Sequence, residues 1–455
     1  MIKKRNGVAK FAAIAAASAL VLTGCATTAE ESTPSETSGG SSGGDSTTQE
    51  EVTISLARFF GDCDDTTEGV TDVKQATSEC EVIQILTNAF NAEDNGVTVE
   101  KLGGQAWGDY YTQLGTTFSG GTPPDVAVMH QHRLPDYVTR GLLTPVGDLL
   151  TAEGVDFNDY TAPALGAVTY EGDYYGVPFD IHASLWHVNV DLYDAAGLTD
   201  SAGMPIMPSS AAELISQCNA IESATGKQYF AHDWFEFGVG ARLFLGLVWQ
   251  QGGDLSDGVT ATADTPEGAE ALRLLNEIAT ECSNPEQGYT DSQASFLNGD
   301  VAVLHNGTWV VDQYNREAPF TYMATDVPSV YGGNGAWGDS HMWVMPAQSD
   351  VDPAKQAAAL KFMAYLYEHV GDWAVGTGHI APRTSVIESA SYNEAPQRGN
   401  YSGTASKARM VPAVPGWAGA WDALAEELNA TWVAGKSQSQ ALKDAEARMN
   451  EALAN

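Results

Sequence analysis

The chain contains few basic residues. In 455 residues, 22 Lys and Arg stand against 59 Asp and Glu, which gives a formal net charge of −37. Nucleic acids and anionic lipid surfaces are bound through basic patches, because their phosphate groups carry negative charge. The charge balance therefore excludes nucleic acid and a charged lipid surface as partners. A solvated acidic surface of this kind is typical of an extracellular protein.

Cysteine is scarce as well, with five residues, and neither a CxxC nor an HExxH motif occurs. The spacing therefore supports no zinc or redox site. Four cysteines remain after Cys25, and an even number outside the cytoplasm predicts two disulfides. Four cysteines allow three connectivities, of which we favour Cys63 with Cys80 and Cys218 with Cys282.

Long apolar runs are absent after residue 25, and the single run before it is short. Residues 1–10 are basic, residues 11–22 are apolar, and Leu22-Thr23-Gly24-Cys25 closes the segment. Twelve residues are too few for a permanent membrane span, so residues 1–24 are predicted to be a signal peptide. The LTGC ending resembles the bacterial lipobox, in which the cysteine carries the lipid. We expect Cys25 to anchor the protein at the outer face of the cell membrane; a plain secretory signal is the alternative.

Residues 26–51 contain no aromatic residue and, apart from alanine, nothing apolar. Such a segment buries too little surface to offset its chain entropy. Residues 25–51 are therefore predicted to be a lipidated cysteine followed by a flexible linker. The remaining chain is long enough for two domains with sizeable cores.

An acidic cluster follows the first predicted strand. It consists of Asp62, Asp64, Asp65 and Glu68. These carboxylates are of the type that holds calcium, but their spacing does not match an EF-hand. A solvated loop is the favoured interpretation.

Strands and helices alternate at the start of the folded body. Strand patterns cover residues 52–59, 97–102 and 125–129, and helical patterns cover residues 80–91 and 107–118. This alternation predicts an α/β fold with a parallel sheet wrapped by helices.

Histidines directly follow the third of these strands, in His130-Gln131-His132. Metal-dependent hydrolases with barrel folds use an HxH at a strand end to place two imidazoles on one ion. They need further ligands on later strands, and the other histidines stand in no recognisable ligand spacing. We therefore expect no metal and no cofactor, and we take His130 and His132 as candidates for hydrogen bonds to a ligand.

A large aromatic residue follows a later strand, in FLNGDVAVLHNGTW at residues 296–309. Asn298-Gly299 ends a helical pattern, residues 301–304 form an apolar strand pattern, and Asn306-Gly307 turns the chain towards Trp309. Ligands of α/β proteins gather outside the carboxyl ends of strands. Trp309 is therefore a candidate ligand platform, with core packing as the alternative.

Several segments together resemble one protein family. The run YYGVPFD followed by LWHVNVDLYDAAGL is similar to the lobe crossover of bacterial ABC-transporter extracellular solute-binding proteins of the sugar-binding kind. Further similar segments are GTPPDVAVM, GLLTPVGDLL, FLNGDVAVLHNGTW with Leu304 in place of the usual methionine, GHIAPRTSV and PGWAGAWDALAEEL. Their order and spacing span residues 52–455, which makes the combined resemblance specific.

The resemblance implies a two-lobed fold, in which each lobe is a sheet flanked by helices and about three crossovers join the lobes. The first lobe would comprise residues 52–179 and about 341–375, and the second residues 180–340 and about 376–455. The implied function is that of a monomeric, non-enzymatic lipoprotein that captures an oligosaccharide and delivers it to the permease subunits of an ABC importer. Hinge closure would enclose the ligand.

Sugar recognition determines the candidate site. Pyranose rings stack on aromatic faces, while their hydroxyls need fixed polar partners. The aromatic candidates are Trp234, Trp309, Trp337 and Trp417, whereas Trp249, Trp373, Trp421 and Trp432 are expected in the core. The polar candidates are His130, His132, Asp180, His182, His341 and Arg383. Two alternatives remain open: a secreted glycoside hydrolase, which needs two carboxylates roughly 5 to 10 Å apart, and a binder of a non-sugar solute.

Overall fold

We describe the protein from a computed structural model. It describes residues 51–103, 107–236, 238–257, 259–401, 403–404 and 408–454. These residues belong to one compact unit, Gln49–Asn455. The predicted signal peptide, Cys25 and nearly all of the predicted linker lie outside the described residues. No helix in this described part is both long and apolar enough to cross a membrane.

The first sheet has five strands in the order β2-β1-β3-β12-β6. They are β1 (Val52–Ala57), β2 (Val97–Lys101), β3 (Val126–His130), β6 (Gly176–Pro178) and β12 (His341–Val344). β1 runs parallel to β2 and β3, as the alternation of strands and helices predicts. β12 is antiparallel to β3 and β6. We call this sheet, with the helices that cover it, the first lobe.

The first lobe also contains helices, several of which pack against this sheet. They are α1 (Asp64–Thr67), α2 (Glu79–Ala92), α3 (Trp107–Ser119), α4 (Leu134–Val138), α5 (Gly147–Ala152), α6 (Ala162–Val168) and α13 (Pro353–Glu368). A small hairpin, β4 (Thr169–Tyr170) with β5 (Asp173–Tyr174), follows α6. In α2, Ser78 caps the first turn by accepting a hydrogen bond from the Glu81 amide. Val82, Leu86 and Phe90 recur at helical spacing and are buried.

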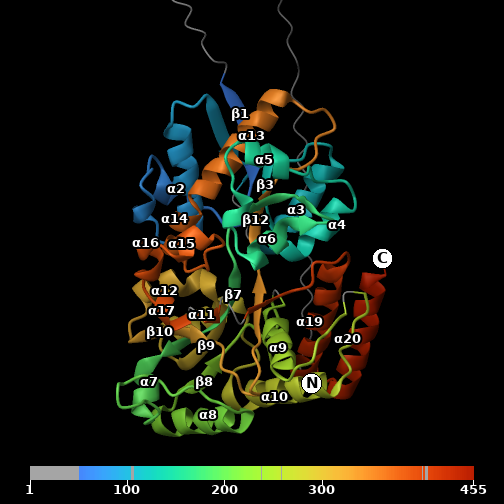
Figure 1. The fold of residues 1–455 in the computed structure, drawn as a ribbon. Helices are drawn as coiled ribbons and strands as arrows, with labels where there is room; N and C mark the ends of the chain where they lie inside the picture. The colour runs from blue at the N-terminus through green and yellow to red at the C-terminus, as the bar shows by residue number, and fades with distance from the viewer. Residues whose placement is uncertain are drawn as a thin grey trace, which may run out of the picture. The chain divides into compact units, whose positions relative to one another are not determined.

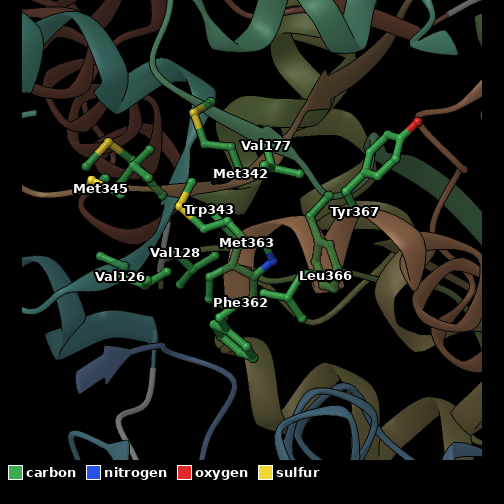
Figure 2. Close-up of a cluster of buried hydrophobic side chains, with 14 of the residues drawn as sticks. Val126, Val128, Val177, Met342, Trp343, Met345, Phe362, Met363, Leu366 and Tyr367 are labelled. Atoms are coloured by element: carbon green, nitrogen blue, oxygen red, sulfur yellow. The ribbon is translucent and has the colours of Figure 1, made fainter. Parts of the chain in front are cut away.

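The core of the first lobe lies between the sheet and α13. Figure 2 shows Val128 of β3 and Trp343 of β12 packed with Phe362 and Leu366 of α13. All five residues of β3 are buried, which is why this strand is apolar throughout rather than alternating.

The second sheet has the order β13-β11-β7-β9-β8, with β10 paired to β7. Its strands are β7 (His182–Asn189), β8 (Gln228–Ala231), β9 (Val301–Gly307), β10 (Tyr322–Asp326), β11 (Ala336–Asp339) and β13 (Ala408–Met410). β8 and β9 are parallel, whereas β7 is antiparallel to β9, β10 and β11. We call this sheet, with the helices around it, the second lobe.

The helices of the second lobe include the last two of the chain, which pack side by side (Figure 1). They are α7 (Val190–Ala195), α8 (Ala211–Thr225), α9 (Val239–Gln250), α10 (Pro266–Glu277), α11 (Tyr289–Leu297), α12 (Val311–Glu317), α19 (Trp417–Val433) and α20 (Gln438–Leu453). Short helices between α13 and β13 are α14 (Val370–Thr377), α15 (Thr384–Ile387), α16 (Ala390–Asn393) and α17 (Arg398–Tyr401).

Two strand segments pass from one sheet to the other. β6 of the first sheet leads through residues 179–181 into β7 of the second, and β11 of the second sheet leads through Ser340 into β12 of the first. A third connection lies beside them, where Ile181 bridges to Ile380. We call residues 179–182 and 339–341 the junction. The predicted fold class of two α/β lobes is confirmed, while the predicted residue bounds of the lobes stay a prediction.

Two disulfides join Cys63 to Cys80 and Cys218 to Cys282, the connectivity favoured from the sequence. The first fastens the acidic loop to α2. In that loop Lys101 Nζ lies 3.1 Å from Asp62 Oδ1 and 2.6 Å from Asp64 Oδ1. Lys101 thus forms ion pairs with two of the carboxylates that were considered for calcium.

Candidate functional site

Adjoining cavities form a cleft to which both lobes contribute. One has a volume of about 470 Å³ and the next about 420 Å³, and both are lined by Trp107, His130 and Arg242. A third, of about 210 Å³, shares Glu79 and Trp309 with the second. Because Trp107 and His130 come from the first lobe and Arg242 and Trp309 from the second, a ligand here would touch both lobes.

Arg242 lies among three indole rings in this cleft. Its guanidinium carbon is 4.1 Å from the ring centroid of Trp337, 5.2 Å from that of Trp309 and 6.0 Å from that of Trp107. Burial lowers the pKa of Arg242 to about 10, so the group stays charged at neutral pH. The rings hold a cation by cation–π attraction and leave an aromatic wall along the cleft.

Trp309 is positioned by the strand that precedes it. β9 ends at Gly307, and the chain turns so that the ring lies against this glycine, where a Cβ atom would collide with it. Trp309 Nε1 donates a hydrogen bond to the Tyr289 hydroxyl at 2.7 Å. The ring is half-buried, so part of it faces the cleft.

The first cavity is the more polar part of the cleft. His132 Nδ1 contacts Asp339 Oδ2, and Arg133, Asp422 and Glu426 also line this cavity. Burial raises the pKa of Asp422, an effect that nearby Arg133 opposes. These groups offer both donors and acceptors to a polyhydroxy ligand.

Strand pairing brings three histidines together at the junction. His130 pairs with His341 where β3 meets β12, and His182 pairs with Asp339 where β7 meets β11. The ring centroids are 4.8 Å apart for His130 and His341, 4.1 Å for His182 and His341, and 5.5 Å for His130 and His182. All three side chains are buried and line the cavity of about 420 Å³.

Asp180 lies behind these histidines and is fully buried. Its carboxylate accepts hydrogen bonds from His182 Nδ1 at 3.0 Å, His341 Nδ1 at 2.8 Å, Trp373 Nε1 at 2.8 Å and the His341 amide at 3.1 Å. Burial alone would raise the pKa of Asp180, but His341 and His379 outweigh it and hold the pKa well below its usual value. The carboxylate is therefore charged at neutral pH.

The imidazoles differ in their protonation. Burial lowers the pKa of His182 to about 3 and that of His130 well below its usual value, and neighbouring His341 adds to both effects. Burial would also lower the pKa of His341, but Asp180 outweighs it and the pKa is raised. At neutral pH, His130 and His182 are thus neutral.

Comparison with known proteins identifies the family. The family model for bacterial extracellular solute-binding proteins matches residues 86–400. The chain belongs to this family. The match confirms the resemblance drawn from the sequence.

This solute-binding protein is similar to two relatives in sequence and to one solved structure in fold. A binding protein of Brucella abortus (strain 2308) is 23% identical over 380 residues, which cover 80% of this chain and 88% of the relative. An uncharacterized lipoprotein of Streptomyces antibioticus is 25% identical over 346 residues, covering 72% and 73%. The GacH receptor of Streptomyces glaucescens GLA.O, solved unliganded and with acarbose, has a TM-score of 0.75 at 20% identity over 89% of this chain and 99% of its own. The family is described as one of solute-binding proteins, and GacH is described as a receptor.

Most candidates from the sequence lie at the cleft of this solute-binding protein. The lining residues among them are His130, His132, His182, Trp309, Trp337, His341 and Trp417. Trp417 is only 1% exposed, so its contact with the cavity is small. Asp180 contacts the histidines from behind.

Two candidates lie elsewhere. Trp234 is fully buried in the core of the second lobe, where its Nε1 donates to Ser283 Oγ at 2.9 Å. Arg383 binds Asp159 through Nε at 2.7 Å and covers the ring of Tyr367. Neither lines a described cavity of the cleft, so we assign both to packing.

Sequence reasoning missed Trp107, Arg242 and Tyr289, and it assigned Trp421 to the core although this ring lines the first cavity. One signal was available for Arg242. It is the single charged residue in α9, VGARLFLGLVWQ, and a lone charge in an apolar helix points to a specific partner. Trp107 carried no comparable signal, since it opens an ordinary amphipathic helix.

Proposed function

We propose that the protein is a lipid-anchored receptor that captures a carbohydrate in the cleft and delivers it to the permease subunits of an ABC importer. The observation that carries the proposal is the group of indole rings of Trp107, Trp309 and Trp337 in one cleft, beside ionisable groups from both lobes.

The chemistry of this wall suits a sugar. Indole faces accept the C–H groups of a pyranose ring, and the carboxylates and cations of the first cavity form charge-assisted hydrogen bonds to hydroxyls. The two main cavities adjoin, and together they favour an oligosaccharide over a single sugar ring. The acarbose complex of GacH, a protein of the same fold, supports this choice of ligand class.

Capture requires that the ligand favour one arrangement of the lobes. A ligand that touches Trp107 of the first lobe and Trp309 of the second binds most tightly when both contacts are made, and so stabilises the closed form. Cys25 would anchor the receptor, and a 26-residue linker would reach roughly 25–30 Å root-mean-square. The receptor would act as a monomer beside its permease.

Calorimetry of the full chain against a panel of oligosaccharides tests the ligand class. We expect saturable binding of at least one glycan and no release of reducing ends. Reducing-end release would instead indicate a glycoside hydrolase, and binding only to a non-sugar solute would overturn the carbohydrate assignment.

Replacing Trp309 tests the aromatic wall. Trp309→Ala should weaken binding of the glycan found in the panel by about 1–3 kcal/mol, because a stacking face is lost. Trp432→Ala is the matched control, since Trp432 donates to the Trp234 carbonyl and lines none of the described cleft cavities. Equal affinities for the wild type and folded Trp309→Ala would assign Trp309 to packing.

The anchor is tested by cell fractionation. Cys25→Ala should move the protein from the membrane fraction to the medium. Retention of the variant in the membrane fraction would contradict lipid anchoring.

A further inference from the structure

The histidines at the junction form a set of potential metal ligands. One ring nitrogen from each of His130, His182 and His341 lies within 4.8 Å of the others. In a tetrahedral zinc site with Zn–N bonds of about 2.0–2.1 Å, ligand nitrogens lie roughly 3.3 Å apart. Binding one ion would therefore require the three ligand nitrogens to approach one another.

The Nδ1 atoms of the three rings make hydrogen bonds, which leaves the Nε2 atoms available to bind a metal. His182 and His341 donate Nδ1–H to Asp180, and His130 Nδ1 lies 2.6 Å from the Tyr111 hydroxyl. Within the described part of the chain, the Nε2 atom of each ring makes no hydrogen bond, and all three rings line the cavity of about 420 Å³. Metal-binding histidines characteristically hold their second nitrogen on a carboxylate or another oxygen, which fixes the ring and makes the free nitrogen a better ligand.

From this arrangement we propose that His130, His182 and His341 bind one divalent transition-metal ion, of the Zn²⁺ class, through their Nε2 atoms. Three protein ligands leave a coordination position open towards the cavity. A ligand in the cleft, or water, would complete the coordination sphere.

Local charge favours a cation at this place. Asp180 and Asp339 are both fully buried at the junction, and their described side-chain ion partners are histidines rather than lysine or arginine. A buried carboxylate needs positive charge nearby, and a bound dication would add to it.

A second arrangement shares one of these residues but is less suited to a metal. Glu79, His341 and His379 also lie within the same mutual distance. Here His379 uses both nitrogens, with Nε2 2.8 Å from Glu79 and Nδ1 3.0 Å from the Thr308 hydroxyl. We therefore assign the site to the three histidines whose Nε2 atoms are available.

The proposed ion would connect the two lobes. His130 and His341 belong to the first sheet, and His182 is the first residue of β7 in the second. Coordination by all three would fix the two crossover strands to each other at the junction. This inference departs from the sequence expectation of no metal, and it depends on the junction geometry rather than on the identity of the carbohydrate.

Direct binding of Zn²⁺ and Co²⁺ to the chelator-treated full chain tests the site. We expect one equivalent of Zn²⁺ by equilibrium dialysis, and an X-ray absorption spectrum dominated by imidazole nitrogen. We also expect Co²⁺ to give the intense visible absorption of a low-coordinate site. Absence of binding, or a spectrum of oxygen ligands alone, would overturn the proposal.

Histidine-to-asparagine variants separate ligation from folding. In His182→Asn and His341→Asn the amide keeps a donor for Asp180 but removes the Nε2 ligand, so Zn²⁺ affinity should fall at least about 100-fold. His187→Asn is the matched control, because His187 lies buried on the same strand with both nitrogens bonded, to the Tyr322 hydroxyl and the Gly307 carbonyl. Unchanged affinity in folded His182→Asn would contradict the site, and a variant that does not fold leaves the wild-type spectrum to decide.

Glycan binding measured with and without Zn²⁺ keeps this inference apart from the proposed function. Glycan binding by a protein that takes up no metal would remove the metal site and leave the receptor function intact. Zn²⁺ binding without any glycan binding would support the metal site and overturn the carbohydrate assignment.

Discussion

Two buried aspartates, Asp180 at the junction and Asp233 in the second lobe, have opposite electrostatic character. Asp180 is 0% exposed and Asp233 is 1% exposed. Burial raises the pKa of Asp233 to about 7, although the amides of Glu236 and Phe235 and the charge of Arg242 oppose it, whereas histidines hold the pKa of Asp180 well below its usual value. Equal burial thus gives opposite pKa shifts.

The hydrogen bonds explain the difference. Both oxygens of Asp180 receive donors, among them two imidazoles and an indole. In Asp233, Oδ1 accepts the amides of Phe235 and Glu236, while Oδ2 has no hydrogen-bond partner among the described residues. The ionised form of Asp180 is thus stabilised by its surroundings, whereas the ionised form of Asp233 is not. Of these two sites, the junction is the one whose hydrogen bonds favour a buried charge.

Removing the junction carboxylate should have the largest effect. Asp180→Ala leaves two imidazole N–H groups, the Trp373 indole N–H and a backbone amide without their acceptor, so we expect a loss of about 3–5 kcal/mol in unfolding free energy. Urea denaturation at pH 7 measures it. The control Asp148→Ala, at an exposed site in α5, should change stability by less than about 0.5 kcal/mol. A loss at position 180 as small as that of the control would remove the distinction between the two aspartates.

Replacing Asp233 should increase the unfolding free energy above neutral pH, whereas replacing Asp180 decreases it. A folded pKa of about 7 against an unfolded value near 3.8 means that the folded state retains the proton longer. The stabilisation is fully present below pH 4 and is lost as the pH rises through 7, with a total on the order of 4 kcal/mol.

Asp233→Asn keeps the Oδ1 acceptor but cannot ionise. The variant should therefore be more stable than the wild type at pH 8 and should lose this part of the pH dependence. Denaturation series from pH 4 to pH 8 measure both quantities. A parallel pH dependence in wild type and variant would show that Asp233 titrates normally.

The predictability of the fold and of the site differs for a physical reason. Apolar strand patterns are local, so they correctly predicted β1, β2 and β3 and the strand before Trp309. The cleft is not local, because Trp107, Arg242 and Trp337 meet only through the packing of three distant elements.

The proposed metal ligands also could not be predicted from local sequence patterns. Spacing rules detect ligands that share one helix or strand, as in HExxH, and they correctly found no such motif. His130, His182 and His341 stand on three different strands, and only the crossing of β6–β7 and β11–β12 between the sheets brings their rings together. No pattern in the chain encodes that crossing geometry directly.

The smallest expected change in stability is the difference between two tryptophan replacements. The two indole N–H groups donate to different acceptors. Trp373 Nε1 donates to the Asp180 carboxylate at 2.8 Å, and Trp234 Nε1 donates to the Ser283 hydroxyl at 2.9 Å. Both rings are fully buried, so replacement by Phe leaves a similar loss of volume in each case.

Trp373→Phe should cost about 1.5–3 kcal/mol beyond this packing loss, because a charged acceptor loses a donor, and Trp234→Phe only about 0.5–1.5 kcal/mol, because its acceptor is neutral. The difference in urea midpoints between the two variants at pH 7 isolates the contribution of the acceptor's charge. If Trp234→Phe were the more destabilised variant, the junction carboxylate would contribute no more than a neutral hydroxyl. The imidazoles alone would then have to account for the low pKa of Asp180.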